Sequence, residues 1–454
     1  MSGVQRITLH LSEAAVATGG EVMGADVLFT GAGTDTRTIK SGELFIALRG
    51  PNFDGHDFVQ QAQEKGATAV LVDHAMDIDI PMLVVKDTRI AMGKLAHAWR
   101  KRFNIPVIAV TGSNGKTTVK EMLASIFSET GQVHATKGNL NNDIGVPLTL
   151  FELGEQHGSA IIEMGANHAG EIAWLVGLAD PDVAVITNAG AAHLEGFGSL
   201  EGVARAKGEI YQGLSEKGYA VINADDRFAP LWREFAAPRQ RIEFGLNDHH
   251  DVTAVYTPAM DGNAITVTTP HGEVQIKLTL LGRHNVMNAL AAISAAIVMD
   301  VALDDIKAGL EKMRPVPGRL QIKPGINQSR VIDDTYNANP SSVQAALDVV
   351  CSFPGRHFLA LGDMGELGGD AAAMHRRVGE QAREKGLHGL YTTGELAANA
   401  ADAFGAAAFR FATQSEMIAA LQNDLQADTT LLVKGSRRAR MEKVVDALII
   451  TERS

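Results

Sequence analysis

Cysteine is almost absent from this chain of 454 residues, and aromatic residues are scarce. The one cysteine, Cys351, excludes an intramolecular disulfide and a zinc site built from several cysteines, and it favours a reducing compartment. Aromatic residues make up 5% of the sequence, whereas glycine occurs 46 times. This balance is typical of α/β folds, in which many tight turns join strands to helices.

Long apolar segments and an excess of positive charge are also missing. The longest nearly apolar run, residues 289–299, is far shorter than the roughly 20 residues that a membrane-spanning helix needs, and the N-terminal segment has no signal-peptide pattern. The formal net charge of −12 argues against non-specific binding to nucleic acid or to an anionic membrane. We therefore expect a cytoplasmic protein with no nucleic-acid partner and no membrane insertion.

The distribution of strands, helices and prolines predicts three domains. Strands alternate with helices after residue 105 and again after residue 330, which predicts two parallel sheets covered on both faces, the second of them smaller and Rossmann-like. Residues 250–282 read as an antiparallel insertion, and the two prolines within residues 313–318 indicate a linker. The fold class is therefore α/β, with predicted domains at residues 1–104, 105–314 and 315–454.

A phosphate-binding loop is the strongest local signal in the sequence. A buried-strand pattern at residues 105–111 leads into glycines, a lysine and two threonines, and a helix follows. The glycines let the backbone wrap a phosphate, and the helix supplies free N–H groups. Val110 stands where the general P-loop pattern has glycine, but the strand, loop and helix context argues against an ordinary glycine turn. The loop residues are Gly112, Ser113, Asn114, Gly115, Lys116, Thr117 and Thr118.

Three further polar residues follow or end predicted elements of the same segment. Glu163 ends a strand and has the oxygen ligands that Mg²⁺ prefers. His193 follows another strand, where a histidine is as readily an ordinary hydrogen-bonded loop residue as a metal ligand. Lys207, taken alone, would be an exposed surface cation. These residues gain meaning only together with the phosphate loop.

Six motifs give the chain a resemblance to the Mur ligases of peptidoglycan synthesis. This resemblance implies a three-domain architecture, in which a central P-loop domain lies between an N-terminal UDP-binding α/β domain and a C-terminal Rossmann-like domain. It also implies ATP, two Mg²⁺ ions and a carbamylated Lys207 that supplies oxygen ligands beside Glu163 and His193. The motifs are TGSNGKTT (111–118), GNLNNDIGVP (138–147), IEMGANHAGEI (162–172), NAGAAHLEGFGS (188–199), AKGEI (206–210) and GRHNVMNALAA (282–292).

Motifs at both ends of the chain resemble the family members that act on a UDP-N-acetylmuramoyl-tripeptide and add D-alanyl-D-alanine. The Asn-Pro-Arg sequence of the diaminopimelate-adding members is absent, and folylpolyglutamate synthase lacks such a front domain. Another Mur ligase, a folylpolyglutamate synthase-like ligase and a non-catalytic nucleotide switch remain as alternatives. The motifs occupy residues 34–37, 42–50, 53–58, 333–340, 361–368 and 433–437.

The resemblance implies a role for each candidate residue in a reaction that passes through an acyl phosphate. Lys116, Lys207, His193 and Arg319 would serve catalysis, and Thr117, Glu163, His193 and Lys207 would bind metal. Asn285 and Asn288 would contact adenine, Asp334 the ribose and Arg319 the γ-phosphate. A monomer that closes by a hinge movement is expected. The substrate contacts would be Asp35, Thr36, Arg37, Asp54, His56, Asn139, Asn141, Asn142, Tyr336, Asn337, Asn339, Lys434 and Arg437.

Overall fold

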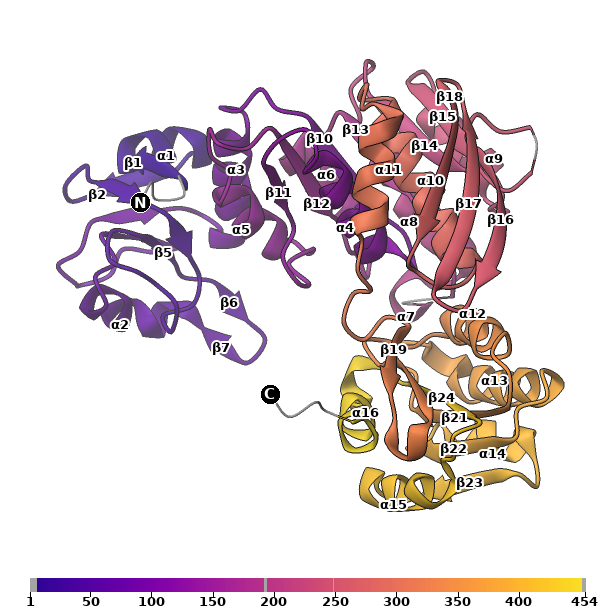
Figure 1. Ribbon diagram of the computed structural model, residues 1–454. Helices are drawn as coiled ribbons and strands as arrows, with labels where there is room; N and C mark the ends of the chain where they lie inside the picture. The colour runs from indigo at the N-terminus through magenta and orange to yellow at the C-terminus, as the bar shows by residue number, and fades with distance from the viewer. Residues whose placement is uncertain (1–5, 192–193, 248, 451–454) are drawn as a thin grey trace.

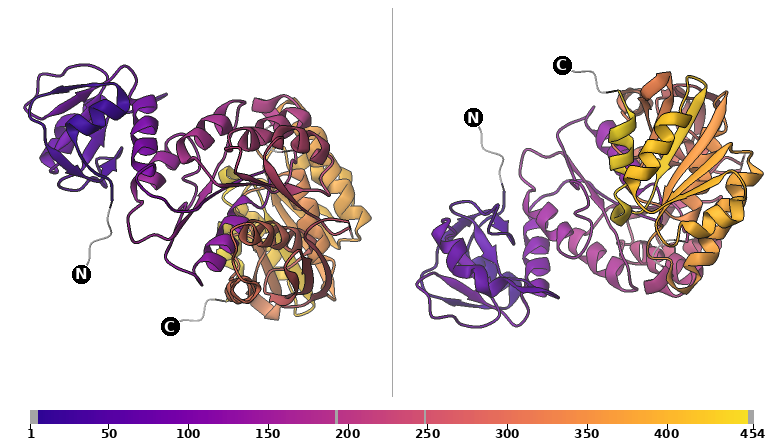
Figure 2. Two further views of the ribbon diagram at one scale, coloured as in Figure 1. Left: turned by 90° about the horizontal axis from the view of Figure 1, so that it is seen from above. Right: turned by 90° about the horizontal axis from the view of Figure 1, so that it is seen from below.

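Three sheet-and-helix units follow one another in the computed structural model, which describes residues 6–191, 194–247 and 249–450 (Figure 1). In Figure 1 the N-terminal unit lies to the left of the central unit and the C-terminal unit lies beneath it, and the two outer units also stand apart in the views from above and below (Figure 2). This arrangement confirms the predicted α/β class with three units. None of the helices in the described ranges is long and apolar enough to cross a membrane.

The N-terminal unit is built on a mixed five-stranded sheet in the order β2-β9-β8-β5-β4. Every residue of its inner strands β5 and β8 is apolar and buried, and helix α3 leads from this unit into the next. The strands are β1 (Thr8–His10), β2 (Glu21–Met23), β3 (Leu28–Thr30), β4 (Ala32–Gly33), β5 (Leu44–Ile46), β6 (Arg49–Gly50), β7 (Phe53–Asp54), β8 (Ala69–Val72) and β9 (Met82–Val84); the helices are α1 (Leu11–Thr18), η1 (Gly55–Phe58), α2 (Val59–Glu64) and α3 (Thr88–Arg100).

The central unit has a six-stranded parallel sheet in the order β11-β12-β10-β13-β14-β15. The predicted antiparallel insertion is confirmed as the separate sheet β16-β17-β18. The strands are β10 (Val107–Thr111), β11 (Val133–Ala135), β12 (Ser159–Glu163), β13 (Val183–Ile186), β14 (Tyr219–Asn223), β15 (Gln240–Phe244), β16 (Thr253–Ala259), β17 (Gly262–Thr269) and β18 (Gly272–Leu278); the helices are α4 (Lys116–Phe127), α5 (Gly145–Phe151), α6 (Glu171–Ala179), α7 (Leu194–Phe197), α8 (Leu200–Gln212), α9 (Ala229–Ala236), α10 (Arg283–Ile297) and α11 (Leu303–Lys312).

The C-terminal unit carries a six-stranded sheet in the order β19-β20-β24-β21-β22-β23. Five strands are parallel, as predicted, but the sequence pattern missed the antiparallel edge strand β19. The strands are β19 (Gln321–Pro324), β20 (Arg330–Asp334), β21 (Arg356–Gly362), β22 (Gly389–Thr393), β23 (Ala408–Phe411) and β24 (Thr429–Lys434); the helices are η2 (Ile326–Gln328), α12 (Pro340–Val350), η3 (Gly368–Asp370), α13 (Ala371–Glu384), α14 (Ala398–Phe404), α15 (Gln414–Asp424), η4 (Arg437–Ala439) and α16 (Glu442–Leu448).

The two junctions between units differ in kind. One continuous apolar core joins the N-terminal unit to a face of the central sheet, and buried Arg100 donates to the backbone carbonyls of Ala179 and Phe103 at this junction. By contrast, within the described ranges, Leu281 is the only residue of the central unit that belongs to the apolar cores of the C-terminal unit. The C-terminal unit is therefore attached mainly by its linker and by polar contacts.

Candidate active site

The phosphate loop lies between β10 and α4, at the carboxyl edge of the central sheet. Gly112 has φ +142°, and a Cβ there would lie 1.9 Å from Thr187 Oγ1. Gly115 has φ +85°, and its Cβ would lie 2.3 Å from Asn288 Oδ1. Both positions therefore need glycine for backbone conformation and for space. Val110, the departure from the general pattern, lies inside β10, where it pairs with Val185.

Lys116 opens helix α4, and its ammonium points back over the loop. Lys116 Nζ donates to Gly112 O at 2.7 Å and to Ser113 O at 3.3 Å. Burial lowers the pKa of Lys116, while the nearby Glu163 carboxylate raises it. The ammonium therefore lies in a low-dielectric position beside the loop, where it can stabilise phosphate oxygens strongly.

The loop after β13 braces the phosphate loop through hydrogen bonds. Asn188 receives the backbone N–H of Asn114 on Oδ1 at 3.1 Å and donates from Nδ2 to Asn114 O at 3.0 Å. Thr187 Oγ1 donates to the same carbonyl at 2.6 Å. Ser113 Oγ accepts from the N–H of Gly190 at 2.9 Å and donates to its carbonyl at 3.0 Å. The phosphate loop is thus held in shape by its neighbour on the sheet edge.

Glu163 ends β12 beside the loop, because β12 pairs with β10 in parallel register. Its side chain is buried, and Oε1 accepts a hydrogen bond of 2.8 Å from Asn141 Nδ2. Among the described residues, Glu163 Oε2 has no hydrogen-bond partner. A buried carboxylate oxygen without a partner is costly, and an Mg²⁺ ion would satisfy it.

Lys207 lies on α8 with 1% of its surface exposed, so the expectation for an ordinary surface lysine does not hold. Burial, followed by the nearby Lys116 ammonium, lowers the pKa of Lys207 to about 7. Its Nζ lies 5.4 Å from the centre of the Phe197 ring. A substantial fraction of the amine, roughly half, is therefore unprotonated near neutral pH. His193, predicted to lie beside it, falls outside the described residues.

Arg319 reaches the phosphate loop from the linker to the C-terminal unit. Its Nη2 donates to Thr117 Oγ1 at 2.9 Å, and its guanidinium lies 4.2 Å from the centre of the Tyr336 ring. Arg319 Nε is buried and has no partner within the part of the chain that the structure describes. The guanidinium is thus held at the loop with donor capacity left for an anion.

Asp334, predicted to contact the ribose, and Lys434, predicted to contact the substrate, bind each other here. Lys434 Nζ donates to Asp334 Oδ2 at 2.5 Å and to Asn337 O at 2.8 Å, and Lys434 is 2% exposed. Asp334 Oδ1 accepts from the N–H of Leu320 at 3.2 Å. Burial raises the pKa of Asp334, whereas the Lys434 ammonium lowers it. In this arrangement the pair fixes the end of the linker.

Most of the other predicted residues bind protein groups or lie exposed in this structure. Asn288 Nδ2 donates to Asn285 Oδ1 at 3.0 Å, so these two predicted adenine contacts are mutually bonded. Asn142 Oδ1 accepts from the N–H of Gly145, the first residue of α5, at 2.8 Å. Thr118 is buried in α4. Asn139 and Arg437 are exposed, and Arg437 Nη1 lies 3.4 Å from Glu442 Oε1.

The predicted N-terminal substrate residues form two polar groups in the N-terminal unit. Arg37 pairs with Asp35 at 2.7 Å on the surface, while Thr36 between them is buried. Asp54 Oδ1 lies 2.6 Å from Nδ1 of buried His56. These residues lie on a different unit from the phosphate loop, so they can hold only a distant part of a long substrate.

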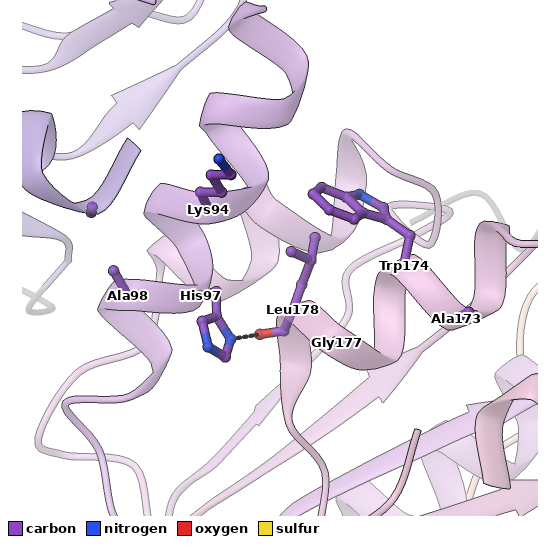
Figure 3. Close-up of a pocket in the computed structure, with 8 residues that line it drawn as sticks. Lys94, His97, Ala98, Ala173, Trp174, Gly177 and Leu178 are labelled. Atoms are coloured by element: carbon purple, nitrogen blue, oxygen red, sulfur yellow. Dashed lines mark hydrogen bonds between the residues drawn. The ribbon is translucent and has the colours of Figure 1, made fainter. Parts of the chain in front are cut away.

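A shallow apolar pocket of about 330 Å³ lies away from this site, between α3 and α6 (Figure 3). Lys94 and Trp174 line it, and His97 Nδ1 lies 3.1 Å from the carbonyl oxygen of Leu178. It contains none of the phosphate-loop residues. The chemistry therefore belongs to the sheet edge and not to this pocket.

Sequence reasoning missed the brace formed by Thr187 and Asn188 and the orienting bond from Asn141 to Glu163. The position of residues 187–190 directly after a buried strand was an available signal, because neighbouring parallel strands end at one edge of the sheet. The hydrogen bonds themselves depend on which strands are neighbours.

Comparison with known proteins agrees with this geometry. The models "Mur ligase family, catalytic domain", "Mur ligase middle domain" and "Mur ligase, glutamate ligase domain" match residues 28–116, 110–296 and 318–437. The UDP-N-acetylmuramoyl-tripeptide--D-alanyl-D-alanine ligase of Escherichia coli (strain K12) is 46% identical over 97% of this chain and 98% of its own.

Two solved structures share the whole architecture. A crystal structure of MurF from Acinetobacter baumannii superimposes with a TM-score of 0.94 at 37% identity, covering 98% of this chain and 99% of the other. The MurF ligase of Thermotoga maritima in complex with ADP has a TM-score of 0.84 at 28% identity, with 92% and 96% covered.

Proposed function

Because the chain belongs to the Mur ligase family, we propose that it uses ATP to join D-alanyl-D-alanine to UDP-N-acetylmuramoyl-tripeptide. The product would be the UDP-muramoyl-pentapeptide of peptidoglycan synthesis. The identity of 46% with the Escherichia coli ligase along nearly the full length of both chains carries the choice of substrates. The third peptide residue, diaminopimelate or lysine, stays open.

Charged groups from the central unit and the linker support ATP-dependent chemistry at the sheet edge. Lys116 and Arg319 place two cations at the phosphate loop, and Thr117 accepts from Arg319. Phosphoryl transfer depends mainly on positioning and on neutralising the charge of the phosphate oxygens. ATP is therefore the proposed cosubstrate, with its phosphates on the loop.

The residues present also fit two Mg²⁺ ions. Glu163 offers a buried oxygen without a partner among the described residues, and Thr117 offers a hydroxyl. Bound Mg²⁺ would offset the negative charge of the phosphates. Lys207 would supply further oxygens as a carbamate, which forms when an unprotonated amine adds CO₂ and loses a proton. The pKa of about 7 and the burial of Lys207 make such an amine available. His193 completes the proposed set of ligands.

The proposed reaction has two steps. The terminal carboxylate of the tripeptide attacks the γ-phosphorus of ATP, and ADP leaves, giving an acyl phosphate. The amine of D-alanyl-D-alanine then attacks the acyl carbon, inorganic phosphate leaves and the nitrogen loses a proton. Lys116 and Arg319 stabilise the charge on the transferred group. Since the acyl phosphate hydrolyses in water, closure of the C-terminal unit over the site would protect it.

A two-substrate assay tests this function. Phosphate release should require UDP-N-acetylmuramoyl-tripeptide and D-alanyl-D-alanine together, and mass spectrometry should detect the pentapeptide product. The variant Lys116→Met should lose the activity, whereas the exposed Lys217→Met should keep it. Release that depends on a different acid and amine would identify another amide ligase. Slow ATP hydrolysis at a rate that does not depend on any amine would indicate a nucleotide switch.

The carbamate has a test of its own that does not depend on turnover. Protein equilibrated with ¹³C-bicarbonate should show a carbamate resonance that Lys207→Ala lacks. Short-chain carboxylic acids should partly restore the activity of Lys207→Ala by supplying the missing oxygens.

Because ATP and a UDP-linked substrate are nucleotides of the cell interior, we place the protein in the cytoplasm. We expect a monomer, since one chain supplies every proposed site residue.

A further inference from the structure

We propose that Asn339 and Ser341, at the start of α12, are positioning residues that hold the C-terminal unit against the phosphate loop by binding the Asn114 side chain. The proposal rests on ATP binding at the phosphate loop, and it does not depend on the identity of the acid or the amine. It assigns to Asn339 a role other than the substrate contact that its sequence position suggested.

A closed ring of three hydrogen bonds joins these side chains. Asn114 Nδ2 donates to Ser341 Oγ at 3.0 Å, and Ser341 Oγ donates to Asn339 Oδ1 at 2.9 Å. Asn339 Nδ2 donates back to Asn114 Oδ1 at 2.8 Å. Within the ring, each side chain donates one hydrogen bond and accepts one. The ring joins two units of the protein.

Asn114 is suited to this role because its backbone is already fixed. Asn188 binds both its N–H and its carbonyl, so the amide side chain projects from a rigid loop. On the other side, Asn339 is fixed by its second function, since Oδ1 also accepts from the N–H of Ser342 at 2.9 Å and caps α12. Capping needs only the oxygen of Asn339. The bond from Nδ2 to Asn114 is therefore an addition that the helix itself does not require.

The junction between the central and C-terminal units depends more on polar contacts than the N-terminal junction does. The N-terminal unit shares a continuous apolar core with the central unit, whereas in the described ranges the C-terminal cores include a single central residue, Leu281. The bond from Arg319 to Thr117 lies close by, at the next turn of the loop. The ring and this bond therefore tie the C-terminal unit to the phosphate loop at two positions, Asn114 and Thr117.

Binding of ATP and docking of the C-terminal unit are consequently linked. The docked arrangement brings Arg319 and the linker to the loop, so a protein that docks less readily should bind ATP less tightly. Loss of the Asn339 donor opens the ring, and we expect about tenfold weaker ATP binding. Binding of the UDP-linked substrate should not change, because the N-terminal junction is separate.

Three variants of the full chain separate docking from helix capping. Asn339→Ser keeps an N-cap hydroxyl but lacks the amide donor, and Ser341→Ala removes the middle member of the ring. Thr413→Ala is the matched control, because Thr413 Oγ1 accepts from the N–H of Glu416 and caps α15 far from the loop. Calorimetry would give the ATP dissociation constant, scattering the radius of gyration and steady-state kinetics the KM for each substrate.

We expect the variants of the ring to change ATP binding and leave binding of the UDP-linked substrate unchanged. Asn339→Ser should raise the ATP dissociation constant and the KM for ATP about tenfold, Ser341→Ala should raise them severalfold, and both should leave the KM for the UDP-linked substrate unchanged. The radius of gyration without ligand should increase. Thr413→Ala should lower the Tm and leave ATP binding intact.

Wild-type ATP affinity and scattering in Asn339→Ser would overturn the proposal, and so would equal weakening by Thr413→Ala. If the proposed ligase function failed instead, ATP would bind and respond to Asn339→Ser while no pentapeptide formed. The two failures are therefore distinguishable.

Discussion

Replacing Lys207 with methionine should inactivate the enzyme and at the same time stabilise the fold. Lys207 is buried on α8, and burial lowers its pKa from the ordinary lysine value of 10.5 to about 7. Keeping a proton on this amine in the folded state costs about 5 kcal/mol at low pH. Methionine fills a similar volume and carries no charge, so this cost disappears in Lys207→Met.

The sign of the pH dependence follows from the two pKa values. Between about pH 7 and 10.5 the unfolded chain carries a proton that the folded chain lacks at Lys207. Wild-type stability from this group therefore rises with pH, by about 1.4 kcal/mol per pH unit in this window. The stabilisation that Lys207→Met gains over the wild type should accordingly shrink by roughly 2–3 kcal/mol between about pH 6.5 and 9.

Urea unfolding in bicarbonate-free buffer, followed by tryptophan fluorescence, measures this difference. Trp232 is a suitable probe, because it is fully buried and its Nε1 donates to Ala204 O of α8 at 3.0 Å. The control variant Lys217→Met changes an exposed lysine in the same unit and should show no such trend with pH. A Lys207→Met advantage that stays constant from about pH 6.5 to 9 would refute the reasoning.

Three further substitutions test other parts of the structure. Glu163→Gln keeps the bond from Asn141 but removes the charge that Mg²⁺ needs, so kcat should fall by about two orders of magnitude or more, with weaker Mg²⁺ dependence in the phosphate-release assay; unchanged kcat would remove Glu163 from the metal site. Gly115→Ala places a Cβ 2.3 Å from Asn288 Oδ1, so calorimetry should detect little or no ATP binding, and normal affinity would contradict the described loop. Arg100→Ala leaves buried carbonyls without donors at the N-terminal junction, and urea unfolding should show a loss of about 2–4 kcal/mol with ATP affinity retained; a neutral result would mean that this junction does not depend on the guanidinium.

Local patterns in the sequence were sufficient for most strands and helices. The short apolar run at residues 69–72, between two turns, predicts a buried strand, and β8 has these bounds. The alanine-rich sequence from residue 285 to residue 299 predicts a helix, and in the structure this helix, α10, begins at Arg283, after Gly282. The sequence pattern also predicts a helix from residue 90, and this helix, α3, begins at Thr88, since Asp87 caps it by accepting from the N–H groups of Arg89 and Ile90. Strand β19 was missed because its alternation is short and follows two prolines.

Some residues of the candidate site could be predicted from local sequence patterns, whereas others are brought together only by folding. Lys116 and Thr117 could be identified from a contiguous motif, because a glycine turn between a strand and a helix creates a phosphate site by local geometry alone. The pairing of Asp334 with Lys434 could not be identified from the sequence. These two residues lie 100 positions apart and meet only because β20 pairs with β24. The proposed roles of His193 and of the N-terminal residues remain predictions.

The sequence by itself determined the order of the elements, the phosphate loop and the family, because each of these is written in short contiguous stretches of chain. Only the tertiary structure decided that Lys207 is buried with a lowered pKa, that Asn141 orients Glu163, and that Asn114 binds Asn339, a residue 225 positions away. The reason is physical: burial, electrostatic coupling and hydrogen bonding depend on distance in space, and folding brings together at one sheet edge groups that the chain itself keeps far apart.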